Sequence, residues 1–386
     1  MPARISIVLT AICLLAVCVS AQTSSPNPRK FEELRTHYES AQRHEASGNW
    51  RAAEEEWRLA LAITPEDARA WTNLGVALNR QNRNAEALAA WRHAIELNPK
   101  LVGAHFNLGL NFVKNNNFTE AIEPLRRVIS LEPDNDAARR ALALALVGAE
   151  RFREASREVA RLLTHSPRDP ALLELAAEIF MQQRRYAEAA IVLRRRLDLS
   201  TANTHLWAQY GDALDGAGRT PEAADAYRKA VDLDPESNAT RYGLGYLYWK
   251  LYRYDEAENE LSEVLRRDPS DARAAFTLGD LYLTRSDAQR SLPFLERAAT
   301  AYPNEFDTRF ALGRALVLTG NLKRGIDELH VAVLLDDSIA DAHFQLGRAL
   351  MQAGQRDEGK QELERTRVLH ETKRTAEGAR FHKKLP

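Results

Sequence analysis

Apolar residues recur along the chain at the spacing of a helix. In one stretch, Trp71, Leu74, Gly75 and Leu78 stand at positions i, i+3, i+4 and i+7, so they share one helix face. A polar break follows, and a second apolar stripe then runs until Pro99, which cannot continue a helix. The pattern predicts two amphipathic helices joined by a short turn.

This two-helix pattern returns every 34 residues. Prolines mark the period, and they stand at Pro65, Pro99, Pro133, Pro167, Pro235, Pro269 and Pro303. A single pair cannot bury both of its faces, whereas stacked pairs share a continuous core, so this period is typical of solenoids. We predict ten units, at residues 34–67, 68–101, 102–135, 136–169, 170–203, 204–237, 238–271, 272–305, 306–339 and 340–373. Residues 374–386 are expected to form a polar cap or tail.

The unit at 68–101 carries the fullest set of repeated residues, which are Trp71, Leu74, Gly75, Leu78, Ala87, Trp91, Ala94 and Pro99. This set resembles the signature of the tetratricopeptide repeat family. The resemblance implies an all-α fold, a right-handed superhelical solenoid of ten helix-turn-helix repeats whose first helices line a concave groove. It also implies a non-catalytic scaffold that binds a partner peptide or helix in that groove.

The resemblance places the groove-facing residues at fixed positions of each first helix. In four successive units these positions and their charged neighbours carry Tyr242, Tyr246, Trp249, Lys250, Phe276, Asp280, Phe310, Arg314, Phe344 and Arg348. Aromatic residues rimmed by charge suit a segment of a partner protein, with the aromatic side chains as anchors. The alternative is that the phenylalanines only pack against the adjacent helix. A second candidate patch consists of Phe106, Leu110, Val113 and Lys114.

Residues 1–21 have the features of a secretory signal. Arg4 supplies a positive start, an uncharged apolar run follows, and Val19-Ser20-Ala21 offers small residues for cleavage. Residues 22–33 are expected to be a flexible spacer. We therefore expect an exported protein, either periplasmic or secreted.

Both cysteines, Cys13 and Cys18, lie inside the signal segment. After cleavage the chain would have none, which excludes disulfide frameworks, cysteine-based zinc sites and thiol nucleophiles. Two alternatives keep a membrane contact through the N-terminus. The apolar run could stay as an uncleaved anchor, although it is short for a membrane span, and Cys18 could be lipidated, although Val17 stands where a small residue is expected.

The composition excludes several classes of protein. With 45% hydrophobic residues and a net charge of -1 from 53 basic and 54 acidic residues, the chain is neither disordered nor a polytopic membrane protein. The absence of a basic excess argues against nucleic acid as a partner, and Arg194-Arg195-Arg196 is expected to be a solvated helix face. A single core rarely exceeds about 250–300 residues, and the 34-residue period decides that this longer chain is one array.

Sequence signatures of catalysis and cofactor binding are missing. His44-Glu45 and His370-Glu371 lack the second histidine of a zinc helix, and neither a nucleophile elbow nor a phosphate-binding loop occurs. His105 and His343 stand at the position of Trp71, so we expect them in the core. We therefore expect no catalytic residue, no metal and no cofactor.

The sequence is compatible with more than one class of function. The resemblance and the signal favour a scaffold in envelope assembly, secretion or export, with a protein or peptide as partner. The alternative is a specificity or accessory subunit of an enzyme complex that acts on the cell wall or on polysaccharide. A less favoured alternative is an enzyme that acts on a small ligand or uses a metal.

Overall fold

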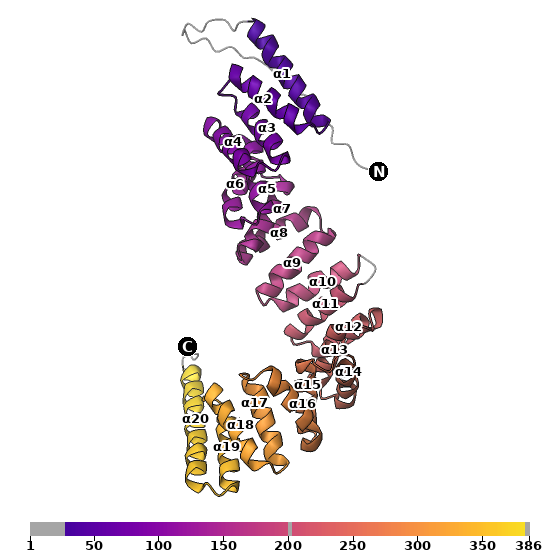
Figure 1. Ribbon diagram of the computed structural model, residues 1–386, viewed down its shortest axis with the longest axis vertical. Coiled ribbons are helices and arrows are strands. Elements are labelled where there is room, and N and C mark those ends of the chain that lie inside the picture. The colour runs from indigo at the N-terminus through magenta and orange to yellow at the C-terminus, as the bar shows by residue number, and fades with distance from the viewer. Residues whose placement is uncertain (1–27, 200–202, 383–386) are drawn as a thin grey trace. The chain divides into compact units, whose positions relative to one another are not determined.

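The computed structural model describes residues 28–199 and 203–382, which form twenty α-helices and no strand (Figure 1). The helices are α1 (Pro28–Ala46), α2 (Trp50–Ile63), α3 (Ala68–Arg80), α4 (Asn84–Leu97), α5 (Val102–Lys114), α6 (Phe118–Leu131), α7 (Asp136–Gly148), α8 (Phe152–His165), α9 (Pro170–Gln182), α10 (Tyr186–Leu197), α11 (Thr204–Gly216), α12 (Thr220–Leu233), α13 (Asn238–Lys250), α14 (Tyr254–Arg267), α15 (Ala272–Thr284), α16 (Ala288–Ala301), α17 (Phe306–Leu318), α18 (Leu322–Leu335), α19 (Ala340–Gln352) and α20 (Arg356–His382). The predicted signal, residues 1–21, lies outside the described residues.

The helices form ten helix-turn-helix pairs, which confirms the all-α repeat fold predicted from the sequence. From α3 onward, each first helix begins 34 residues after the previous one. The N-terminal end differs from the expectation. Helix α1 begins at Pro28, inside the segment 22–33 that the sequence predicts as a spacer, because proline suits the first helical position, where no N–H donor is needed. Helix α20 continues to His382, so most of the predicted tail 374–386 is helical.

The chain divides into two compact units, Met1–Ala149 and Glu150–Pro386. In the first unit, the second helices α2, α4 and α6 pack on the first helices α3, α5 and α7 of the following pairs. In the second unit, α8, α10, α12, α14, α16 and α18 pack in the same way on α9, α11, α13, α15, α17 and α19. Each pair therefore depends mainly on its immediate neighbours for burial.

Most first helices begin at a capping side chain. The side-chain oxygens of Asp67, Asn135, Asp169, Asn203, Ser237 and Asp271 accept hydrogen bonds from backbone N–H groups in the first turn of the helix that follows. Each such cap stabilises a helix by about 1 kcal/mol. The repeated cap stabilises the start of these six helices at the same position of the period.

The turn inside each pair requires a residue with left-handed backbone. Within residues 28–199 and 203–382, the residues with positive φ are Gly48, Asn82, Asn116, Glu150, Arg184, Gly218, Tyr252, Ser286, Gly320 and Gly354, which stand 34 residues apart. Only glycine adopts this conformation without a steric penalty, and asparagine tolerates it better than most residues. Glu150, Arg184 and Tyr252 therefore hold backbone strain at their turns.

Replacing Arg184 with glycine is expected to stabilise the second unit. Its side chain is exposed and its φ is 55°, so Arg184→Gly removes a strain of about 1 kcal/mol and leaves the packing unchanged. Gly218 is the matched control, because its φ is 78° and no atom lies within 4 Å of the position that a Cβ atom would take. In urea titrations, Arg184→Gly should raise and Gly218→Ala should lower the unfolding midpoint; equal midpoints would contradict the strain at this turn.

Within a pair, the two helices approach closely at a glycine of the first helix. A Cβ atom on Gly75 would lie 2.6 Å from Trp91 Cδ1, and one on Gly109 would lie 2.6 Å from Leu125 Cγ. These distances are too short for any side chain, so a large residue of the second helix occupies the space that glycine leaves. The Leu-Gly pairs in the sequence therefore mark the contact points between helices.

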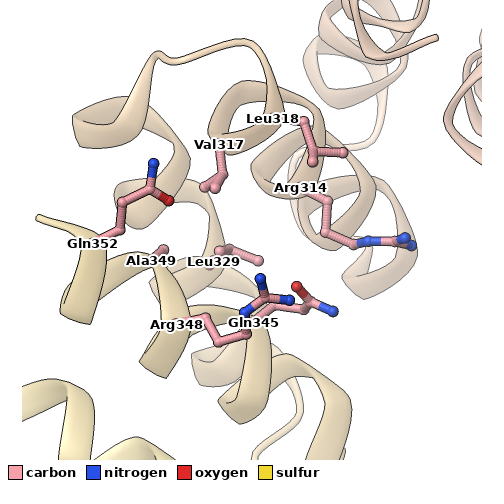
Figure 2. A pocket seen from close by; sticks show the side chains of 8 residues that line it. All are labelled: Arg314, Val317, Leu318, Leu329, Gln345, Arg348, Ala349 and Gln352. Atoms are coloured by element: carbon pink, nitrogen blue, oxygen red, sulfur yellow. The ribbon is translucent and has the colours of Figure 1, made fainter. Parts of the chain in front are cut away.

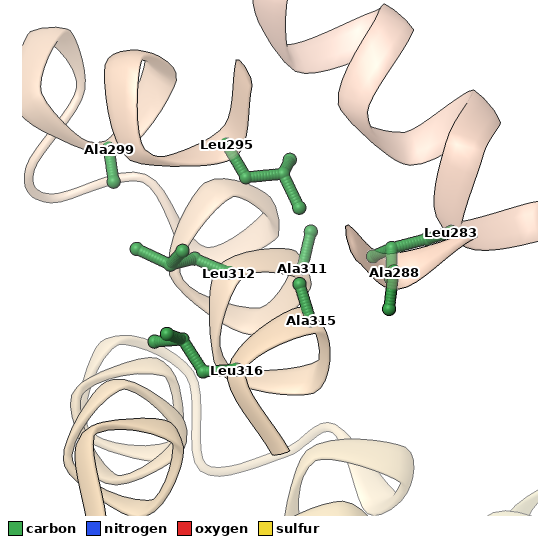
Figure 3. Close-up of a cluster of buried hydrophobic side chains, with 8 residues drawn as sticks. All are labelled: Leu283, Ala288, Leu295, Ala299, Ala311, Leu312, Ala315 and Leu316. Atoms are coloured by element: carbon green, nitrogen blue, oxygen red, sulfur yellow. The ribbon is translucent and has the colours of Figure 1, made fainter. Parts of the chain in front are cut away.

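Small and large residues alternate in the core of the second unit. One cluster joins α15, α16 and α17 through Leu283, Ala288, Leu295, Ala299, Ala311, Leu312, Ala315 and Leu316 (Figure 3). The alanines allow the three helices to approach, and the leucines fill the remaining volume. Burial is thus distributed along the stack and not collected in one globular centre.

In the second unit, the first helices from α11 to α19 form a continuous layer. Helix α11 contacts α13, and the contact recurs from α13 to α15, from α15 to α17 and from α17 to α19. Successive second helices in the described part of this unit approach one another less closely. The stack therefore curves toward its first helices, and we call the surface of α13, α15, α17 and α19 the first-helix face.

Candidate functional site

The ten residues of the main candidate site all lie on the first-helix face. Tyr242, Tyr246, Trp249 and Lys250 belong to α13, and the remaining six belong to α15, α17 and α19, with two residues on each helix. All four residues of the second candidate patch lie on α5, in the first compact unit. The two candidate sites are therefore described separately.

Three aromatic rings on α13 form a stack. The ring centres of Tyr242 and Tyr246 are 6.2 Å apart, and those of Tyr246 and Trp249 are 5.6 Å apart, with interplanar angles of 26° and 27°. Cations flank the stack, with Lys250 Nζ 5.8 Å from the Tyr246 ring centre and the Arg273 guanidinium 4.8 Å from that of Tyr242. Tyr246 stays 37% exposed, so the stack presents an aromatic edge to solvent.

Carboxylates of the two neighbouring first helices contact the C-terminal end of α13. Lys250 Nζ forms an ion pair with Asp215 of α11 at 2.7 Å. The Trp249 side chain donates a hydrogen bond to Asp280 of α15. Burial raises the pKa of the Asp280 carboxyl, and the nearby positive charge of Arg314 and the Trp249 hydrogen bond oppose that rise. The aromatic stack is therefore held in place by charged side chains from both neighbouring repeats.

The raised pKa of Asp280 predicts a pH-dependent stability. Because its pKa in the folded state exceeds the ordinary value of 3.8, this group favours folding below pH 3.8 and loses that contribution as the pH rises through the folded pKa. Asp280→Asn keeps an acceptor for Trp249 and removes the charge, so the variant should be more stable than the native chain at pH 7. In urea titrations the difference should vanish near pH 3; a less stable variant at pH 7 would contradict the assignment.

The three phenylalanines of the candidate site differ in packing and exposure. Phe276 packs against the buried cluster of α15, α16 and α17, and Phe310 packs against a second cluster that includes Leu329 and Leu346. Phe310 also stacks on Phe306, with ring centres 5.5 Å apart. Phe344 is 38% exposed. Phe276 and Phe310 thus contribute to packing, and Phe344 is the phenylalanine most available to a partner.

A cavity of about 510 Å³ opens between α17, α18 and α19. It is lined by Arg314, Val317, Leu318, Leu329, Gln345, Arg348, Ala349 and Gln352 (Figure 2). The two arginines belong to the sequence-predicted site, but the two glutamines and Leu329 do not. Leu329 comes from a second helix, so the groove positions of the first helices could not indicate it. The glutamines follow Phe344 on α19 at positions 345 and 352, which a helical wheel of α19 could have indicated.

The second candidate patch is smaller. Phe106 and Val113 are half-buried, whereas Leu110 and Lys114 are exposed. Between them, buried Asn111 donates to the side-chain oxygen of Asn79 at 2.8 Å, which ties α5 to α3. The patch therefore lies over a hydrogen-bonded contact between two first helices.

The buried histidines have structural roles. His105 Nε2 lies 3.1 Å from the carbonyl oxygen of Pro99, and His343 Nε2 lies 3.0 Å from that of Asp337. Trp71 Nε1 donates to the carbonyl oxygen of Pro65 at the same position of the repeat. These side chains tie each first helix to the turn before it. In the described ranges, no group of three or more His, Cys, Asp or Glu side chains is placed to hold a metal ion.

The described helices were compared with the length and hydropathy that a membrane-spanning helix needs. Among the helices of residues 28–199 and 203–382, none combines the length and the hydropathy that a bilayer crossing requires.

Helix pairs with a fixed period, stacked within each compact unit, define a helical-repeat solenoid, and the second unit adds an aromatic, charged face. Family models of the tetratricopeptide repeat match the sequence at residues 68–101, at residues 112–179, and at residues 209–261 and 242–306. Together these matches cover about half of the chain. The chain belongs to the tetratricopeptide repeat family, whose fold is typical of non-catalytic interaction scaffolds.

Several solved structures are similar to parts of this chain. MamA (residues 41 to the end) from Desulfovibrio magneticus RS-1 is 21% identical, and the match covers 44% of this chain and 96% of that one, with a TM-score of 0.41. The structure of Naa15/Naa10 bound to HypK-THB is 16% identical, and the match covers 88% of this chain and 64% of that one, with a TM-score of 0.49. No curated protein matches the sequence. Family membership therefore rests on the repeat models and on the helix pairs themselves.

Proposed function

We propose that this protein is a scaffold that binds an extended or helical segment of a partner protein on the first-helix face. The observation that carries this proposal is the exposure of two aromatic side chains on this face, Tyr246 on α13 and Phe344 on α19, each with a cation beside its ring. Exposed aromatic and arginine side chains are the residues that most often dominate binding energy at protein interfaces. Because neighbouring first helices contact one another, one segment can cross several repeats.

We further propose that the protein acts outside the cytoplasm, in envelope assembly, secretion or export. The support for this part is the sequence of residues 1–21, with its positive start, apolar run and small residues before Gln22.

Binding to the first-helix face can be tested with a double substitution. Tyr246→Ala with Phe344→Ala removes two exposed rings and leaves the buried clusters intact, so the yield of partner crosslinked to the chain in its native cells should fall at least tenfold. The matched control is Tyr252→Ala with Leu334→Ala, because both of these side chains are exposed and neither belongs to a first helix. Circular dichroism should stay helical for both variants. A control that loses as much partner as the test variant would contradict the proposal.

A further inference from the structure

The outward side of helix α8 carries three arginines. Arg153, Arg157 and Arg161 follow one another at intervals of four residues, so they share one side of the helix, and all three are exposed. The buried residues of α8 lie on the opposite side, and they are Ala155, Val159 and Leu162. The three arginines therefore point away from the core of the stack.

These three arginines have no anionic partner within the fold. Among the side chains of residues 28–199 and 203–382, none is bound to the guanidinium group of Arg153, Arg157 or Arg161 by a salt bridge or hydrogen bond. The glutamate that follows Arg153 in the sequence, Glu154, is paired with Arg151 at 2.7 Å. Like charges spaced four residues apart on a helix repel one another. An anion bound at this side of α8 would relieve that repulsion.

Helix α10 extends the arginine-rich surface. Arg195 stands at the position of the 34-residue period that Arg161 occupies, and its Nη2 donates to the carbonyl oxygen of Pro167 at 2.6 Å. Pro167 belongs to the turn after α8, so this bond holds the outward side of α10 near the C-terminal end of α8. Ile191 precedes Arg195 by one helical turn and is 59% exposed. We call Arg153, Arg157, Arg161, Ile191 and Arg195 the second-helix basic surface.

The charge at these outward positions changes along the second helices of the unit. The three positions that carry arginine on α8 carry Asp255, Asn259 and Glu263 on α14. On α12 the same positions carry Pro221, Asp225 and Lys229. An anionic surface is therefore attracted to α8 and α10 and repelled at α14, although the net charge of the whole chain is only -1.

We propose that the second-helix basic surface binds the anionic lipid headgroups of a membrane. Arginine binds phosphate oxygens through charge-assisted hydrogen bonds, and each cationic side chain near a negatively charged bilayer strengthens the attachment. The exposed Ile191 favours a bilayer over a soluble polyanion, because a membrane interface accepts apolar and basic side chains together. This contact goes beyond the proposed function, since it uses none of the helices of the first-helix face and leaves that face free for a partner protein.

Flotation of the full chain with lipid vesicles tests the proposal. The probes are vesicles of phosphatidylcholine alone and vesicles of phosphatidylcholine mixed with phosphatidylglycerol. The test variant combines Arg153→Gln, Arg157→Gln and Arg161→Gln. The matched control combines Lys229→Gln, Arg297→Gln and Lys323→Gln, which removes three exposed cations from corresponding outward positions of α12, α16 and α18. All these chains share residues 1–21, so insertion of that apolar run contributes equally to each.

We expect the native chain to bind the anionic vesicles more tightly than the neutral ones. The test variant should lose about fivefold in affinity for each arginine removed, or on the order of 100-fold in total, whereas the control should bind like the native chain. Added salt should weaken the binding of the native chain. Equal losses in both variants, or equal binding of the native chain to both kinds of vesicle, would overturn the proposal.

Ile191→Ala separates a membrane from a soluble polyanion as the ligand. This substitution should weaken binding to the anionic vesicles severalfold and leave binding to heparin and to duplex DNA unchanged. If the native chain bound heparin or DNA as tightly as vesicles, and Ile191→Ala had no effect on vesicle binding, a soluble polyanion would replace the lipid. Crosslinking of the partner protein to the first-helix face should persist in the triple arginine variant, so the failure of either proposal leaves the other testable.

Discussion

Replacing Gly75 with alanine is expected to lower the free energy of unfolding of the first unit by about 2 kcal/mol. The added methyl group would lie 2.6 Å from Trp91 Cδ1, and Trp91 cannot move easily because it is fully buried and donates a hydrogen bond to the backbone oxygen of Thr72. Helices α3 and α4 must therefore separate, which also weakens their contacts with α2 and α5. A urea titration followed by tryptophan fluorescence measures the change.

A second glycine of the same unit provides the control. Gly103 lies in α5, and a Cβ atom there would meet only Thr72 Cγ2, at 3.9 Å. Gly103→Ala should therefore stabilise the unit by about 0.5–1 kcal/mol through helix propensity alone. If Gly75→Ala proved as harmless as Gly103→Ala, close helix contact at the Leu-Gly positions would no longer explain the packing.

The largest loss is expected from Trp57→Ala, at about 3–5 kcal/mol. Trp57 of α2 is fully buried, its Nε1 donates to Glu45 Oε1 at 2.8 Å, and its ring meets that of Tyr38 edge-to-face at 4.8 Å. Removing it leaves a cavity between α1 and α2 and an unpaired carboxylate that is partly buried. Because each pair contacts only its neighbours, hydrogen exchange should accelerate in α1 and α2 and stay slow in α15 to α18.

Leu59→Ala on the same helix is the comparison for Trp57→Ala. Leu59 is 50% exposed, so its truncation should change stability by less than about 1 kcal/mol and leave exchange in α1 unchanged. Faster exchange throughout both compact units in Trp57→Ala would contradict the nearest-neighbour description of this array.

The fold could be predicted from the sequence because the same helix-pair pattern recurs in each 34-residue unit. The proline at the end of a pair, the glycine at the helix contact and the capping residue recur at fixed spacing, so the helix pairs could be predicted as units. The ends of the array have no such repetition. The helical start at Pro28 and the extension of α20 to His382 therefore fell outside what the period could predict.

The sequence could predict which residues of the candidate site lie on the first helices, but not which of them are exposed. Periodicity places Tyr246 and Phe344 on the first helices, but it does not determine whether a ring also contacts the next helix. Phe276 and Phe310 do contact it, so they pack against buried clusters. The ion pair of Lys250 with Asp215 spans 35 residues, one period plus one, and this spacing is a signal that sequence reasoning could have used.

The cavity between α17, α18 and α19 could not be predicted from the periodicity of single helices. Leu329 reaches the floor from α18, and its contribution depends on how far α17 and α19 separate. This separation follows from the packing of all three helices, not from the pattern on any one of them.

The central claim is that the first-helix face of the second unit binds the partner, and a photo-crosslinking scan in native cells tests it most directly. A photoreactive residue would replace, one at a time, Tyr246, Phe344 and Met351 on first helices, and Tyr252, Leu334 and Val368, which are exposed elsewhere in the same unit. The account predicts a common crosslinked partner at the first three positions and none at the other three. The same partner at all six positions, or only at the last three, would contradict it.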